Sequence, residues 1–202
     1  MKFLSLIIAV FVAITATSCK VVGTLYPLSQ NSRDFVFKKE LIGKWQESIE
    51  QSVHYLIDTI SGREGKLYSI TCIEKSNETN ITDTTILSAF LIKVNDWYYL
   101  DCSLEIGSNP FLNKKKINDF LHPRHFIFRL AFGEKDKLEV ASLDTDELIR
   151  LIDEKKISLH YANLKKDDYL ILDKSEILQK TLSETKKNYL MFKNKSILKK
   201  IL

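Results

Sequence analysis

The first half of the chain, after an apolar N-terminus, alternates polar and apolar residues with period two. This alternation predicts strands rich in Ile, Tyr, Thr and Leu. The expected strands are 52–60, 66–74, 86–93 and 97–104. The last two are joined by Asn95-Asp96, a two-residue loop that tolerates positive φ, so a β-hairpin is expected there. The earlier segment ELIGKWQES is expected to form a first strand that carries Trp45 into the core.

A second hairpin is expected around Gly133, in the run HFIFRLAFGEKDKLEVASL. Period two places the side chains of Phe126, Phe128, Leu130 and Phe132 on one face. That face must belong to the core. His125 and Arg129 lie on the other face, so they point outward or into whatever element crosses that side.

Helical patterns come late in the chain. Asp144 followed by Glu147 is a capping-box arrangement, and the same device recurs with Asp173 and Glu176. The expected buried stripes are Leu148, Leu151 and Ile152 in the first helix, and Leu178, Leu182 and Tyr189 in the second, which spans 173–190. A short helix at 113–121 and short strands at 157–164 and 168–172 complete the expectation.

This order of elements, with strands first and helices later, predicts an α+β fold. We expect a curled antiparallel sheet or a small lipocalin-like barrel, with two or three helices towards the C-terminus.

The N-terminus has the features of a secretory signal peptide. Lys2 gives a positive start, and residues 3–16 form an apolar run that is shorter than the ~20 residues of a membrane-spanning helix. The small residues Ala16, Thr17 and Ser18 then stand directly before Cys19.

This ending resembles the lipobox of bacterial lipoproteins, although a larger aliphatic residue is more usual at the position of Ala16. The resemblance implies cleavage after Ser18 and acylation of Cys19, and three acyl chains would anchor the protein firmly. A soluble secreted protein and an uncleaved anchor helix are the alternatives. Lys20 is not the aspartate that retains some lipoproteins at the inner membrane, so we expect a lipid-anchored envelope protein of the outer membrane.

Composition fits one ordinary globular domain after a signal peptide at 1–18. Residues 19–34 are expected to form a lipid-anchored tether, and 35–192 a single β-rich domain. The formal net charge of the chain is +4, and removing residues 1–18 takes away only Lys2, leaving +3. A charge so close to neutral argues against a nucleic-acid partner.

Cys72 and Cys102 fall in expected strands, each on a face with apolar neighbours. In a meander the strand 86–93 would separate them by two strand spacings, about 9–10 Å, which exceeds the usual reach of a disulfide. We therefore expect two buried thiols, with a disulfide as the alternative.

Several short segments resemble a family of uncharacterised bacterial envelope proteins. They are LIGKW, AFLIKVNDWYYLD, HPRHFIFRL, DKLEVASLDTDEL and ILDKSEILQKTL, and they span roughly residues 40–192. In that family a Gly-x-Trp strand leads into a lipocalin-like body that contains a His-x-x-His-Phe segment. The resemblance implies a barrel-like body and no established activity.

Other chemistry has weaker support. His122 and His125 could bind a metal with His160 or Asp101, but residues three apart in an extended segment face opposite ways. The carboxylates near residue 144 are explained by the start of a helix. No Gly-x-Ser-x-Gly elbow or phosphate-binding loop is present in the sequence. We expect no metal, no cofactor and no catalytic residue.

The tail at 193–202 is basic and amphipathic when drawn as a helix, with Ile197, Leu198 and Ile201 on one side. Such a helix can dock on the domain, which we favour, or lie on an anionic membrane surface.

Our functional expectation is a non-enzymatic envelope protein that binds a small apolar ligand or a protein partner. The mouth of a barrel is a common ligand site. The candidate binding residues are Trp45, Trp97, Tyr99, His125 and Arg129. The alternatives are an accessory subunit of an envelope assembly and a hydrolase without a readable motif.

Overall fold

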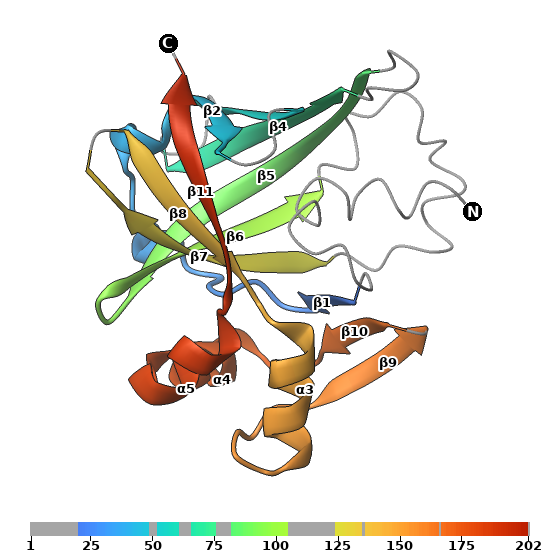
Figure 1. Cartoon of the computed structure of the whole chain (residues 1–202). Coiled ribbons are helices and arrows are strands. Elements are labelled where there is room, and N and C mark those ends of the chain that lie inside the picture. The colour runs from blue at the N-terminus through green and yellow to red at the C-terminus, as the bar shows by residue number, and fades with distance from the viewer. Residues whose placement is uncertain are drawn as a thin grey trace, which may run out of the picture.

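The computed structural model describes residues 20–48, 52–60, 66–75, 82–104, 124–134, 136–165 and 167–201. Its main body is a closed antiparallel barrel of eight strands (Figure 1). The strands are β2 (Gly43–Glu47), β3 (Val53–Thr59), β4 (Leu67–Lys75), β5 (Thr82–Val94), β6 (Trp97–Leu104), β7 (His125–Phe132), β8 (Lys137–Ser142) and β11 (Asn194–Ile201).

The barrel is an up-and-down meander. Strands β2 to β8 pair in sequence order, and β11 pairs with both β8 and β2. The final seam places Leu198 beside Leu138 of β8 and Lys200 beside Trp45 of β2. Because every strand of the barrel has two neighbours, closure leaves no open edge in this part of the sheet.

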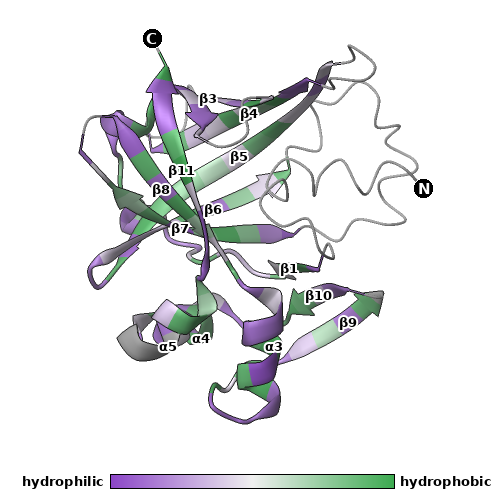
Figure 2. Cartoon of the chain, in the orientation of Figure 1, coloured by the Kyte–Doolittle hydropathy of each residue, from purple (hydrophilic) through white to green (hydrophobic). Residues whose placement is uncertain are grey.

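Period-two patterning fills the barrel. Along β4, for example, Tyr68, Ile70 and Cys72 point inward and are almost fully buried. Figure 2 shows hydrophobic and hydrophilic residues alternating along β8, for example. The interior cluster is Leu41, Trp45, Val53, Tyr55, Ile57, Tyr68, Ile70, Cys72, Leu87, Ala89, Leu91, Leu100, Cys102, Phe128, Leu130, Leu138, Val140 and Leu198.

An outer layer covers one side of the barrel wall, and most of it is inserted between β8 and β11 (Figure 1). It consists of α3 (Thr145–Asp153), β9 (Tyr161–Lys165), β10 (Asp168–Ile171), α4 (Ser175–Ser183) and α5 (Thr185–Met191). Strand β1 (Val21–Thr24) belongs to it as well, because it runs parallel to β10 and bridges to β7. The 3-10 turns Ser32–Asp34 and Lys39–Leu41 lie between β1 and β2.

A second apolar cluster joins this layer to the barrel. Side chains that point out of the barrel wall, such as Ile127 and Tyr99, pack with Leu148 of α3, Leu178 of α4 and Phe192. The outer layer is therefore part of the same folded body as the barrel.

The expected strands and both hairpins are confirmed. The expected barrel with helices towards the C-terminus is confirmed. The expected α+β class is wrong, because the described part of the chain is mostly β. Asp144 caps α3 as expected, since its carboxylate accepts a 3.0 Å hydrogen bond from the Glu147 N–H. The helix expected at 113–121 lies outside the described residues.

The expected helix at 173–190 is two helices, which meet at Glu184. This break changes the buried face: Asn188 is fully buried, whereas Tyr189 is 64% exposed. Asp173 does not cap α4, whose N-cap is Lys174. Its carboxylate instead accepts the backbone N–H of His160.

Both chain ends also differ from expectation. Residues 194–201 form strand β11, not a helix: Ser196 and Leu198 point into the barrel, while Lys195, Ile197 and Lys199 point out. Nor is the expected tether free, because β1 lies in the outer layer. Leu28, further along that segment, is fully buried.

Candidate functional site

The five candidate binding residues lie in two different environments. Trp45 points into the barrel, whereas Trp97, Tyr99, His125 and Arg129 belong to the outer side of the wall formed by β6 and β7. Tyr99 and Arg129 are direct partners across these strands. The structure therefore brings four of the five to one side of the sheet and separates the fifth.

Trp45 is a core residue. Its side chain is 3% exposed, and its indole N–H donates a 2.8 Å hydrogen bond to the Leu41 carbonyl. The ammonium of Lys200 lies over the ring, 5.3 Å from its centroid. These contacts satisfy the polar atom of the indole and cover the ring, so Trp45 is part of the packing of the barrel.

The barrel interior also contains a polar pair. Ser196 of β11 donates a 2.6 Å hydrogen bond to the carboxylate of Glu47 of β2, and both residues are buried. The remaining interior side chains in the described strands are mainly large and apolar. A barrel of eight strands is just wide enough for such side chains to fill it.

Arg129 is the centre of a buried polar cluster on the outer side of the wall. Only 2% of this residue is exposed. Its guanidinium donates to the Asn188 side-chain oxygen at 2.9 Å and to the Phe192 carbonyl at 3.3 Å. It also stacks 4.3 Å from the centroid of the Trp97 ring. Asn188 in turn donates to the Tyr99 hydroxyl, so the cluster ties α5 to β6 and β7.

Burial shifts the pKa values of this cluster. It lowers the pKa of the Arg129 guanidinium, because the charged form loses its hydration. It raises the pKa of the Tyr99 phenol to about 12, since burial penalises the phenolate. At neutral pH the Arg129 guanidinium is therefore charged and the Tyr99 phenol is neutral, and in these states both groups hold the outer layer against the barrel.

His125 has a different partner. Its ring Nδ1 lies 2.7 Å from a carboxylate oxygen of Asp101, which is 1% exposed. The other oxygen of Asp101 accepts the Leu28 backbone N–H at 2.6 Å. The Asp101–His125 pair therefore fastens the segment that follows β1 to the barrel wall.

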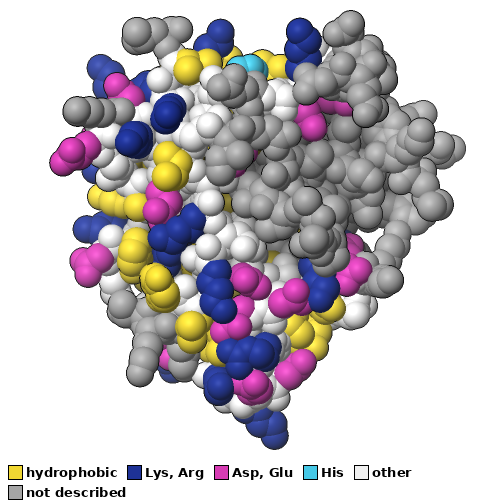
Figure 3. All heavy atoms as spheres, viewed as in Figure 1, with side chains coloured by type: hydrophobic (Ala, Val, Ile, Leu, Met, Phe, Trp, Pro, Cys, Tyr) yellow, Lys and Arg dark blue, Asp and Glu magenta, His cyan; other side chains and the backbone are white. Residues whose placement is uncertain are grey.

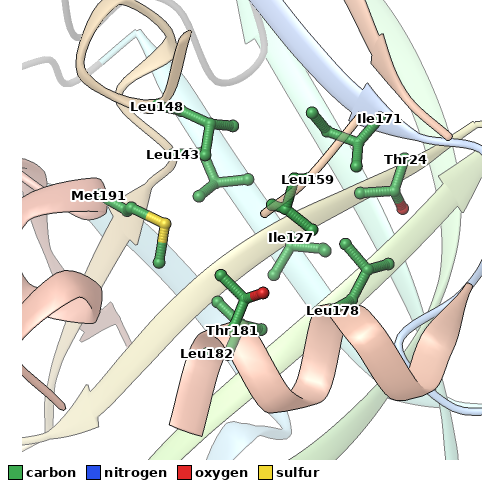
Figure 4. A pocket seen from close by; sticks show the side chains of 10 residues that line it. All are labelled: Thr24, Ile127, Leu143, Leu148, Leu159, Ile171, Leu178, Thr181, Leu182 and Met191. Atoms are coloured by element: carbon green, nitrogen blue, oxygen red, sulfur yellow. The ribbon is translucent and has the colours of Figure 1, made fainter. Parts of the chain in front are cut away.

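A small apolar cavity lies between the barrel wall and the outer layer (Figure 4). Its volume is about 20 Å³, little more than one water molecule requires. The hydroxyls of Thr24 and Thr181 in its wall already donate to the carbonyls of Tyr26 and Ile177. The cavity is thus apolar and too small for a ligand. Its lining is Thr24, Ile127, Leu143, Leu148, Leu159, Ile171, Leu178, Thr181, Leu182 and Met191.

The start of the described chain is bound tightly to the outer layer. The ammonium of Lys20 pairs with the carboxylate of Asp146, and this hydrogen bond raises the pKa of the lysine. The Lys20 carbonyl accepts the Thr145 hydroxyl at 3.4 Å. Next to it, Arg124 makes a bidentate pair with Asp168 of β10, with distances of 2.6 and 3.1 Å.

The cysteines fall into two groups. Cys72 and Cys102 are free and buried inside the barrel, which confirms the expectation of two thiols separated by β5. Burial raises the pKa of both thiols, so they are poor nucleophiles. Cys19 lies outside the described residues, and its acylation stays a prediction.

The described residues hold no group of three or more His, Cys, Asp or Glu side chains that could bind a metal ion. His125 pairs with Asp101, and His160 with Asp173, while His122 lies outside the described part of the chain. Within the same part, no helix is long and apolar enough to cross a membrane.

Sequence reasoning missed two important polar residues of the outer layer. Asn188 was not among the residues expected to be buried, because a single helix through 173–190 would bury Tyr189 instead. Asp101 was considered as a metal ligand and not as the partner of a backbone N–H. Its position between Tyr99 and Ser103 on the outer face of β6 was the available signal.

No known protein-family model matches the chain, and no curated protein or solved structure matches it either. The resemblance to envelope proteins therefore stays a prediction, and the site is interpreted from its geometry.

Proposed function

We propose that this chain is a lipid-anchored protein of the bacterial cell envelope, attached through Cys19. The observation that carries the proposal is the sequence Ala16-Thr17-Ser18-Cys19, which follows an apolar run and resembles a lipobox. The other two cysteines, Cys72 and Cys102, are buried inside the barrel and so are unsuited to modification.

The anchor is tested by the intact mass of the protein purified from membranes. The expected mass corresponds to a chain that starts at Cys19 and carries a diacylglyceryl group and an N-acyl chain. Cys19→Ser should remain unprocessed and lack the lipid mass, while the matched variant Cys102→Ser should keep it. A mature protein that retains Met1, or starts at Cys19 without added acyl mass, would contradict the proposal.

We further propose that the domain binds a protein partner rather than a small apolar ligand. The filling of the described barrel interior supports this choice, and so does the small size of the cavity in the outer layer. Lys20 supports an outer-membrane location, on the resemblance to lipoprotein sorting signals. A lipid-anchored scaffold of this kind would act as an accessory subunit of an envelope assembly.

Native mass spectrometry of the protein extracted from membranes separates these two functions. A stoichiometric protein partner would support the proposal. A small molecule that stays bound through purification, with no partner protein, would contradict it and restore the ligand-binding alternative.

A further inference from the structure

The residue next to the proposed anchor is fixed to the folded domain. Lys20 is held by Asp146 through its ammonium and by Thr145 through its carbonyl. The N–H of Val21 then donates a 2.8 Å hydrogen bond to the Asp167 carbonyl, at the turn between β9 and β10. The chain therefore has no free length between Lys20 and the domain.

These contacts belong to a rigid set. All four residues of β1 pair with β10, from Val21 opposite Asp168 to Thr24 opposite Ile171. Strand β10 is held by the bidentate pair between Arg124 and Asp168, both of which are largely buried. Beyond β1, the buried Asp101 carboxylate holds the Leu28 N–H. Moving Lys20 away from the domain would break several of these contacts together.

This geometry limits how far the domain can stand from a bilayer. The Cα atoms of Cys19 and Lys20 are about 3.8 Å apart, as in any trans peptide. The headgroup layer on each side of the hydrocarbon core is about 5–8 Å thick. An acyl group on Cys19 therefore brings Lys20 to the level of the headgroups, together with the elements that hold it.

We infer that the acylated protein sits directly on the bilayer through one defined surface. This surface, called the anchor face below, consists of Lys20, Thr145, Asp146, Asp167 and Asp168. The inference rests on the lipid anchor proposed above and adds the orientation of the domain. The β5–β6 turn lies on the opposite side of the molecule, so it points into the aqueous compartment (Figure 1).

The charges of the anchor face indicate which lipids it fits. Lys20 is paired with Asp146, and Arg124 beside the face is paired with Asp168. In the sequence, Lys165 and Lys166 directly precede Asp167, so two positive charges and one negative charge remain, which is a net charge of +1. Across the described part of the view in Figure 3, positive and negative side chains are likewise mixed. A net charge of +1 is much smaller than the clusters of about 4–8 Lys and Arg that draw proteins to anionic membranes, so the face fits a zwitterionic headgroup layer.

Two single-cysteine labels test the orientation. Asn163→Cys lies on β9, two strands from Val22 and hence about 10 Å away. Asp96→Cys lies in the β5–β6 turn, and both positions are exposed. The native thiols do not compete for the label, because Cys72 and Cys102 are buried and Cys19 is blocked by its lipid.

The labelled, acylated protein is reconstituted in zwitterionic vesicles that contain a lipid with a quencher on its headgroup. We expect quenching of the label at 163 to exceed that at 96 several-fold. Inserting 20 Gly/Ser residues between Cys19 and Lys20 gives a span of about 25 Å, and the difference should then disappear. Adding anionic lipid should leave the difference unchanged.

Equal quenching at the two positions in the acylated protein without the linker would overturn the inference and leave the anchor intact. A difference that survives the linker would also overturn it, because the face would then bind lipid independently of the anchor. Failure of the proposed function is recognised separately, by the absence of acyl mass on Cys19.

Discussion

Gly43, the glycine of LIGKW, shows how a single residue constrains the barrel. Its φ is +137°, and a Cβ atom built there would lie 2.6 Å from Cε of Lys200, the side chain that covers Trp45. Side chains rarely adopt this backbone conformation, and strain of this kind costs on the order of 1–3 kcal/mol. The glycine thus allows β2 and β11 to meet at the seam.

We therefore predict that Gly43→Ala lowers the free energy of unfolding by about 1–3 kcal/mol. The measurement is urea unfolding followed by tryptophan fluorescence. Gly23→Ala is the matched control, because a Cβ atom there would make only ordinary contacts, at 3.4 Å or more. Equal losses in the two variants would show that the seam does not depend on a glycine at position 43.

Tyr99 predicts a stability change at high pH. Its pKa is raised to about 12 in the folded state by burial, compared with about 10 in an unfolded chain. Between these values the unfolded chain has lost the phenolic proton while the folded protein keeps it, so the free energy of unfolding falls as pH rises. Two pKa units correspond to about 2–3 kcal/mol.

Unfolding in urea at a series of pH values checks this prediction against Tyr99→Phe. The variant lacks the titrating group and should lose less stability between pH 10 and pH 12. The variant also loses the hydrogen bond that Asn188 donates to the Tyr99 hydroxyl. The two proteins are therefore compared by the slope of the unfolding free energy against pH and not by its absolute value. Identical slopes would mean that the phenol titrates normally.

At the scale of elements, β11 supplies the sharpest test. Leu198 is 6% exposed inside the barrel, whereas the adjacent Ile197 is 48% exposed on its outer surface. We predict that Leu198→Ala costs about 2–5 kcal/mol of unfolding free energy, and that Ile197→Ala changes it by about 0.5 kcal/mol or less. Thermal and urea unfolding measure both. Comparable losses would be expected from a helix, which would place the two residues on one side.

The sequence predicted the hairpins because their pattern is local. The Phe126–Phe132 alternation and the Asn95-Asp96 turn each specify an element without reference to distant residues. The seam was not predictable in this way, because the hydropathy of residues 194–201 fits a helix better than a strand: Ile197 and Leu198 are adjacent, and Lys199 and Lys200 follow them. Pairing with β2 and β8 decides between them, and those strands are far away in the sequence.

The candidate site shows the same limit. Alternation along β7 correctly placed Arg129 on the face away from the barrel core, where the structure pairs it with Tyr99 of β6. What covers that face is α5 with Phe192, and this packing turns an apparent binding surface into a buried contact between layers. This contact could be predicted only by knowing that the helix breaks at Glu184. Because of the break, Asn188 and not Tyr189 lies on the buried side of α5.

At the scale of the whole molecule, Cys72 and Cys102 report on the integrity of the barrel. In Cys19→Ser protein we predict no measurable reaction with a thiol reagent in buffer, because both sulfurs are buried and their pKa values are raised. Both thiols should become reactive together across the urea transition observed by fluorescence. Reaction of one thiol well before that transition would show that part of the barrel opens independently.

The seam between β2 and β11 also has a consequence for how the protein is made. Its register joins Lys44 to Ile201, so the first and last strands of the barrel pair only after residues 194–201 have been synthesised. Contacts between residues so distant in sequence form slowly, on a scale of about milliseconds to seconds for β-rich domains. A nascent chain that lacks its last eight or so residues has an open sheet with two exposed edges. For the exported protein proposed above, this delay would keep the chain open for passage through a translocation channel before the barrel closes.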